Sequence, residues 1–182
     1  MIKEKQLRFQ IHTRTTTYLF EVTKSGHLKH YYYGPALSEK DAANWDISNS
    51  VGWGCSLLYR QDDPSSSLHT TPLEWSGSGC GDYRESPIEV EGDWGVLTTD
   101  FRYQSHNIYT GEGPHRFLWP RADGAEETLE VCLSDPEISM ELRLYWSVFG
   151  DVICRKALLI NRGENPRYVR KLMSSCVGFM GE

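Results

Sequence analysis

The chain has 182 residues, a formal net charge of −6 at pH 7 and an aromatic content of 12%. This length fits one domain and is sufficient to bury a hydrophobic core. The negative charge argues against nucleic acid as a partner, because phosphate contacts require clustered Lys and Arg. No stretch approaches the roughly 20 apolar residues of a membrane helix, so no membrane partner is expected.

The N-terminus and the cysteines indicate the compartment. Residues 1–9 alternate charged and apolar side chains without an apolar run, so we expect no secretory signal and a cytoplasmic protein. The five cysteines form an odd set without a Cys-x-x-Cys pair, which predicts reduced thiols. They are Cys55, Cys80, Cys132, Cys154 and Cys176.

The first third of the chain alternates with a period of two, and no segment of the chain shows a helical stripe. Leu7, Phe9 and Ile11 alternate with polar residues. The runs 18–22 and 27–33 flank Gly26, which can adopt a positive φ, so they are predicted to form a β-hairpin. The following segment, residues 36–86, is rich in Ser, Asp, Gly and Pro but also holds tryptophans. Irregular segments of this length are commonly functional, so function is sought here first.

Strand patterns resume after this segment. They cover residues 88–91, 98–109, 128–134, 140–148, 152–160 and 168–179, with a turn at 92–95. In the clearest of them, the residues from Met140 to Val148 alternate, with Tyr145 and Ser147 on the polar side facing solvent or a second polar layer. Hairpins without intervening helices predict an all-β fold, an antiparallel β-sandwich.

Sequence motifs for catalysis are scarce. No nucleophile elbow, zinc-protease motif, phosphate-binding loop or dinucleotide fingerprint is present, so no cofactor is expected. His27 and His30 are three residues apart, but positions i and i+3 of a strand point to opposite faces, which argues against a metal site. The segment 81–87 concentrates charge in a turn, where Asp82 or Glu85 would pair with Arg84.

Five segments in sequence order resemble the N-terminal domain of glycoside hydrolase family 36 alpha-galactosidases. The most specific is Thr99-Asp-Phe-Arg-Tyr-Gln-Ser-His-Asn-Ile108, and Gly81-Asp-Tyr-Arg-Glu-Ser-Pro87 is similar to a Gly-Asp-Phe-Arg signature of that family. The remaining matches are residues 11–18 with 26–34, residues 125–130 with the strand that follows, and residues 152–157 with 161–163.

The resemblance implies that residues 1–182 form a large β-sandwich, a supersandwich, that precedes a (β/α)8 barrel. In the family the barrel carries an aspartate nucleophile and an aspartate acid/base, and hydrolysis retains the anomeric configuration. Neither catalytic segment has a counterpart in this sequence, which also ends before the family's sandwich is complete. We therefore expect a domain that is inactive alone, with its own catalytic domain as a partner.

Family members often form homotetramers in which loops of the N-terminal domain wall the active site of a neighbouring subunit. By resemblance, Asp46 and Arg60 would bind the hydroxyl groups of galactose, since charged groups make strong hydrogen bonds. Trp53 or Trp45 would stack on the sugar. The alternative is that all four only shape a surface loop.

Two functions of different classes follow. The first is an assembly and active-site domain of an intracellular alpha-galactosidase acting on galactosides such as melibiose and raffinose. The second is a free-standing, lectin-like sugar-binding module, because sandwich folds host many sugar binders. A purely structural domain is a third reading.

Overall fold

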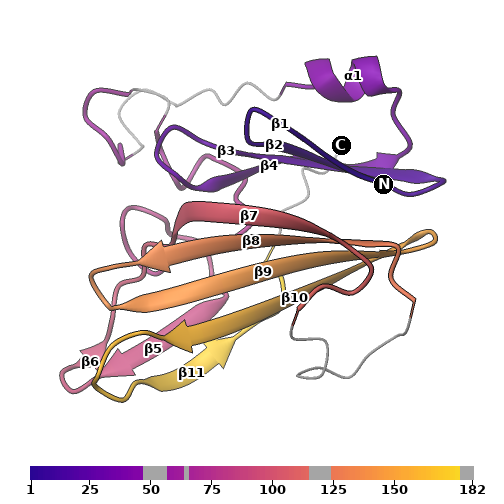
Figure 1. The fold of residues 1–182 in the computed structure, drawn as a ribbon. Helices are drawn as coiled ribbons and strands as arrows, with labels where there is room; N and C mark the ends of the chain where they lie inside the picture. Colours follow the sequence, from indigo (N-terminus) through magenta and orange to yellow (C-terminus); the bar gives the residue numbers. More distant parts are fainter. Residues whose placement is uncertain (47–56, 64–65, 115–123, 177–182) are drawn as a thin grey trace.

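In the computed structural model, the described residues are 1–46, 57–63, 66–114 and 124–176, and the rest of the chain is drawn in grey in Figure 1. Trp53 and Cys55 lie outside these ranges. Nearly all regular structure is antiparallel β, arranged as a sandwich, as the sequence predicts. Among the described residues no helix is both long and apolar enough to cross a membrane.

The first sheet is a meander at the N-terminus with the order β1-β2-β3-β4. Its strands are β1 (Ile2–Lys5), β2 (Arg8–His12), β3 (Thr16–Val22) and β4 (Leu28–Pro35). The predicted hairpin is the β3–β4 pair, and Gly26 turns the chain with a φ of 87°. Leu7 differs from the prediction: it lies in the β1–β2 turn with a φ of 63° rather than in a strand.

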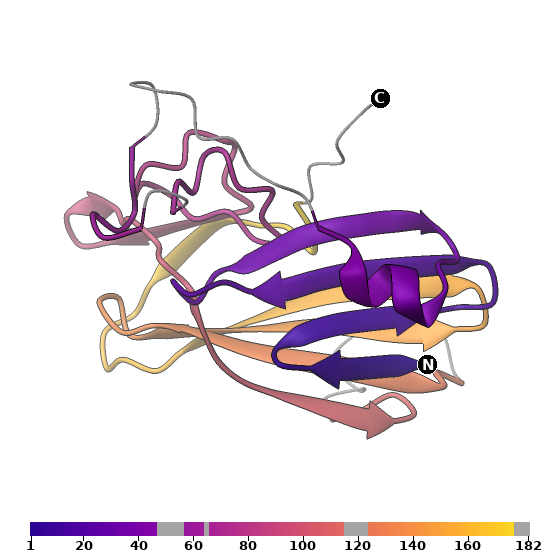
Figure 2. The same ribbon diagram turned by 90° about the horizontal axis from the view of Figure 1, so that it is seen from above.

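The second sheet has the order β10-β9-β8-β7. Its strands are β7 (Arg102–Thr110), β8 (Glu127–Asp135), β9 (Met140–Phe149) and β10 (Val152–Asn161). The first sheet covers it in both views (Figures 1 and 2). The core between the sheets contains Phe9, Phe20 and Ile11 from the first sheet, together with the alternate apolar residues of β8 and β9 that the sequence predicts to point inward.

The sequence predicts that the opposite side of the second sheet faces either solvent or a second polar layer, and the structure shows that its polar residues on β9 are buried. Tyr145 and Ser147 are 2% and 5% exposed. Tyr145 donates a 2.7 Å hydrogen bond to the buried carboxylate of Glu130, and Thr128 donates one of 2.9 Å to Ser147. This side is therefore the second polar layer of the two alternatives, because its polar groups satisfy one another.

A smaller third sheet has the order β11-β5-β6 and lies beside β10 in both views. It comprises β5 (Ile88–Gly92), β6 (Gly95–Val96) and β11 (Tyr168–Leu172). The predicted last strand is therefore shorter than expected, and residues 177–182 lie outside the described ranges. Ile88 and Val90 of β5 extend the main core.

The described part of the irregular segment contains one short helix, α1 (Glu39–Asn44), which the strand patterns do not predict. Ser38 caps it by accepting a hydrogen bond from the Asp41 amide at 3.2 Å. With only six residues, the helix is too short to show a stripe, and a single buried residue, Ala42, anchors it on the first sheet beside Leu19 and Tyr31.

Candidate functional site

The end of α1 presents two of the predicted sugar-binding residues. The ring of Trp45 lies 4.7 Å from that of Tyr32 on β4, and Trp45 is partly buried by this contact. Asp46 follows directly and is exposed. Arg8 donates hydrogen bonds to the carbonyl oxygens of Ala42 and Trp45, so a cation holds the C-terminal end of the helix.

Asp46 lies close enough to Tyr31 to affect its ionisation. Burial raises the pKa of Tyr31 most, the hydrogen bond to Glu21 adds to this, and the negative charge of Asp46 contributes as well. The guanidinium of Arg8 lies 4.7 Å from the centre of the Tyr31 ring and opposes the effect. Asp46 therefore places its negative charge close to Tyr31 and directly after Trp45, which contacts Tyr32.

Arg60 lies on a separate loop with contacts of its own. Its guanidinium donates to both carboxylate oxygens of Asp62, at 3.0 and 2.7 Å, and its amide donates to Ser66 Oγ at 2.9 Å. The Arg60 side chain is 46% exposed. The structure thus brings Trp45 and Asp46 together and places Arg60 against Asp62 instead. Trp53 lies outside the described residues.

A buried ion cluster fixes the irregular segment to the sandwich, and the sequence did not reveal it. The Glu74 carboxylate is fully buried and accepts hydrogen bonds from Tyr18, His30 and Arg155, all at 2.7 Å. Arg155 also donates to the Glu74 carbonyl oxygen at 2.6 Å. Burial alone would raise the pKa of Glu74, but the Arg155 charge and the His30 bond hold it below its usual value.

A second cluster anchors the irregular segment through Tyr59. Asp100 accepts hydrogen bonds from His27 at 2.8 Å and from the Tyr59 hydroxyl at 2.7 Å. Burial and the Asp100 carboxylate raise the pKa of Tyr59 to about 12. His27 and His30 therefore serve two different carboxylates, and no group of metal-ligating side chains occurs among the described residues.

The predicted charged turn is confirmed, with Asp82 as the partner. Arg84 Nε lies 2.9 Å from the carboxylate of Asp82, whose side chain is buried. The same guanidinium donates to the carbonyl oxygens of Leu68 and Thr71 at 2.7 and 2.8 Å. Arg84 thus cross-links the loops, and the charged turn has a structural role.

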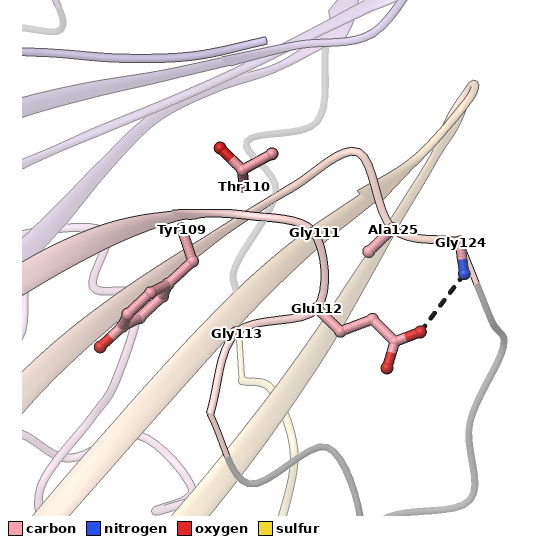
Figure 3. A pocket seen from close by; sticks show the side chains of 7 residues that line it. All are labelled: Tyr109, Thr110, Gly111, Glu112, Gly113, Gly124 and Ala125. Atoms are coloured by element: carbon pink, nitrogen blue, oxygen red, sulfur yellow. Dashed lines mark hydrogen bonds between the residues drawn. The ribbon is translucent and has the colours of Figure 1, made fainter.

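A hollow of about 590 Å³ lies at the far end of β7 (Figure 3). It is lined by Tyr109, Glu112 and the glycine-rich backbone around them, and Glu112 accepts a 3.3 Å hydrogen bond from the Gly124 amide. Tyr109 donates to Glu130 at 2.7 Å, so its hydroxyl belongs to the polar layer of the second sheet. Of the predicted sugar-binding residues that the structure describes, Trp45, Asp46 and Arg60, none lines this hollow.

Comparisons with known proteins agree with this fold. Residues 26–182 match the model of the glycosyl hydrolase family 36 N-terminal domain. The bifunctional alpha-galactosidase/sucrose kinase AgaSK of Mediterraneibacter gnavus is 30% identical over 181 residues, which are 94% of this chain and 19% of that protein. Alpha-galactosidase AgaA of Geobacillus stearothermophilus is 27% identical over 94% of this chain and 24% of its own.

Solved structures give the same result. The galactosidase domain of AgaSK superimposes with a TM-score of 0.84 and 27% identity, covering 97% of this chain and 25% of that one. A doubly substituted variant of AgaA in complex with raffinose superimposes with a TM-score of 0.79 and 27% identity, over 93% of this chain and 24% of the variant. The chain therefore spans about a fifth to a quarter of the length of the relatives it matches.

Proposed function

Because the chain belongs to the glycosyl hydrolase family 36 N-terminal domain family, we propose that it is the non-catalytic N-terminal domain of an alpha-galactosidase. The whole enzyme would hydrolyse terminal alpha-galactosides such as melibiose and raffinose. The observation that carries the proposal is the family match over residues 26–182, together with the shared sandwich.

The buried carboxylates support a non-catalytic role. A retaining glycosidase needs two carboxyl groups about 5–5.5 Å apart that can reach a sugar. Glu74 is enclosed by Tyr18, His30 and Arg155, and Glu130 accepts hydrogen bonds from Tyr109 and Tyr145. Groups saturated by donors of the protein itself serve stability, so the chemistry is assigned to the polypeptide beyond this domain.

The sugar-binding part of the proposal rests on the end of α1. Asp46 is exposed and could accept hydrogen bonds from galactose hydroxyls, and Trp45 offers the part of its ring that Tyr32 leaves uncovered. Arg60 would contribute the donors that Asp62 does not use, and Trp53 would stack on the sugar. These residues would wall the active site of a neighbouring subunit in a cytoplasmic homotetramer.

The size of the native protein tests the main proposal. An antibody raised to this chain should detect a band far heavier than 20.9 kDa in source cells, and alpha-galactosidase activity should co-purify with it. A band at the chain's own mass, without activity, contradicts the proposal and points to a free-standing module, for which sugar-binding screens would follow.

A substitution in the full-length enzyme tests the sugar contact. Asp46→Asn should raise KM for melibiose on the order of 10- to 100-fold, because a hydrogen bond to a charged group contributes about 1.5–3 kcal/mol. The matched control is Asp93→Asn, an exposed aspartate on the β5–β6 turn, which should leave KM unchanged. Unaltered kinetics for Asp46→Asn would remove this residue from the site.

A further inference from the structure

An exposed aromatic side chain stands on the charged turn at residues 81–87. Tyr83 is 72% exposed, whereas Asp82, its neighbour in the chain, is only 6% exposed. The ring therefore lies outside the hydrophobic core, although the turn that carries it is anchored inside the protein. A single exposed aromatic side chain is ordinary on a protein surface, so the way in which the backbone holds it decides whether it has a role.

The backbone immediately before Tyr83 is strained. Cys80 and Gly81 have φ values of 54° and 79°, and the Asp82 amide closes the turn with a 3.1 Å hydrogen bond to the Gly79 carbonyl oxygen. Positive φ at both central residues is characteristic of a type I′ turn, which favours Gly, Asn or Asp at these positions. Cys80 carries a Cβ and is unfavourable there. Strained backbone persists only where the surrounding structure enforces it, and it is concentrated at functional sites.

Arg84 fixes the backbone on the other side of Tyr83. Its amide donates a 3.2 Å hydrogen bond to Asp82 Oδ1, and its guanidinium donates to both oxygens of the same carboxylate at 2.9 Å. The guanidinium also holds the carbonyl oxygens of Leu68 and Thr71. Both neighbours of Tyr83 are therefore immobilised, so its ring projects from a rigid base and loses little conformational entropy when it binds a ligand.

His69 lies beside the Tyr83 ring. The two ring centres are 5.3 Å apart with 72° between the ring planes, so His69 leaves at least one face of Tyr83 uncovered. His69 is itself exposed, and an imidazole can donate and accept hydrogen bonds. A sugar ring has C–H groups on its faces, which the negative face of an aromatic ring attracts, and hydroxyl groups at its rim. A flat aromatic face next to a hydrogen-bonding group therefore suits a sugar.

The same loops hold Arg60, one of the proposed galactose contacts. The Arg60 amide donates to Ser66 Oγ at 2.9 Å, and Ser66 Oγ donates to the Arg60 carbonyl oxygen at 3.0 Å. Ser66 directly precedes the turn 67–71, whose carbonyl oxygens Arg84 binds. Arg60 and Tyr83 thus belong to one hydrogen-bonded loop assembly, with the turn 67–71 between them.

We propose that Tyr83, with His69 at its side, contacts the sugar unit that follows the terminal galactose of the substrate. The inference rests on the proposed function, in which Asp46 and Arg60 bind the galactose itself. Because the turn 67–71 separates Tyr83 from Arg60, the aromatic ring is displaced from the galactose contact and reaches the next unit of an oligosaccharide. Tyr83 then sets a preference for galactosides whose leaving group is a sugar.

A protein surface is the competing partner for this ring, and its surroundings favour the sugar. The exposed apolar side chain that approaches the turn is Leu57, which packs against Gly81. One aliphatic side chain and one aromatic ring are far less than the roughly 800 Å² per partner that a stable protein interface needs. His69 and the exposed Glu85 instead place polar groups around the ring, as in a site for a small polar ligand.

Hydrolysis of two substrates by the full-length enzyme tests the inference. Melibiose carries a glucose unit after the galactose, whereas methyl alpha-galactoside carries only a methyl group. Tyr83→Ala should lower kcat/KM for melibiose about 2- to 10-fold and leave kcat/KM for methyl alpha-galactoside unchanged. Tyr83→Phe keeps the ring and should behave as the natural enzyme does. The matched control is Tyr168→Ala, which removes a 65% exposed tyrosine of β11 and should alter neither value.

The inference and the proposed function fail in different ways. An equal loss for both substrates, or no loss for either, overturns the sugar contact while the natural enzyme remains an alpha-galactosidase. Size-exclusion chromatography of Tyr83→Ala is measured alongside, and an equal loss together with a changed oligomeric state shows that the ring contacts protein instead. A natural full-length protein that hydrolyses neither substrate overturns the proposed function and, with it, this inference.

Discussion

Arg155 on β10 and Glu74 in the irregular segment form a buried ion pair, with 2.7 Å between Arg155 Nη1 and Glu74 Oε2. Arg155 also lies 4.8 Å over the ring of Trp146, and its second amino group donates to the Glu74 backbone. A residue of the second sheet thereby holds the loop segment that follows the first sheet. The pair thereby fixes the position of this part of the irregular segment on the sandwich.

Removing the cation of this pair should be costly. Arg155→Met leaves the Glu74 carboxylate buried without its main counter-charge, and we expect the free energy of unfolding to fall by about 3–5 kcal/mol. The matched control is Arg162→Met, which breaks a pair between the exposed Arg162 and the partly buried Glu141 and should cost less than about 1 kcal/mol. Urea denaturation measures both, and equal losses would contradict the assigned role.

The pair should also shape the acid stability of the protein. The pKa of Glu74 is lowered in the folded state, because the Arg155 charge and the His30 bond outweigh burial. A carboxylate with a depressed folded pKa stabilises the fold above its unfolded pKa, about 4.3, and this contribution is lost as the pH falls through the folded value. The stability advantage of the natural protein over Glu74→Gln should therefore shrink below about pH 4. Urea denaturation between pH 3 and 7 measures this, and a constant difference would contradict it.

The sandwich could be predicted because the alternation of apolar and polar residues along a strand indicates which of its two sides is buried. Leu142 and Leu144 lie on the inward side of β9, as their period of two predicts, and both are fully buried. The polar layer was harder, because the burial of Tyr145 depends on a hydrogen bond to Glu130 on another strand. Strand patterns show which residues share a side, but not what satisfies the polar side.

The buried ion cluster could not be predicted from the sequence. The partners of Glu74 are His30, Tyr18 and Arg155, which are 44, 56 and 81 residues away in the chain. Glu74 itself lies in a segment without periodicity, so no local pattern marks it as buried. The Asp46 and Trp45 predictions came instead from family resemblance, which gives no geometry. Their contact with a sugar stays a prediction.

A side chain at Gly26 in the β3–β4 turn should destabilise the fold. Its φ of +87° is strained for any other residue, and an added Cβ would lie 3.2 Å from Arg102 Cβ. Gly26→Ala should lower the free energy of unfolding by about 1–2 kcal/mol from backbone strain, with a further loss from this contact. Gly124→Ala is the control, since Gly124 has a φ of +90° and nothing within 4 Å. Urea denaturation measures both changes, and an equal cost for the two variants would show that the contact with Arg102 does not matter.

Substitution of two tryptophans, one exposed and one buried, should have very different effects on stability. Trp94 at the β5–β6 turn is 100% exposed, so Trp94→Ser should change the free energy of unfolding by less than about 0.5 kcal/mol. It should nevertheless remove the component of the fluorescence that iodide quenches most readily. Trp146 is 0% exposed and stacks on Phe20 at 4.7 Å, so Trp146→Phe should cost about 1–3 kcal/mol.

Urea denaturation and iodide quenching of the same samples check both expectations. If Trp94→Ser destabilised the fold or left quenching unchanged, the turn would be packed against another part of the protein. A loss of quenching with unchanged stability would instead establish Trp94 as a solvent-facing aromatic side chain. Its side chain would then be free to contact another polypeptide, because its removal costs this domain no stability.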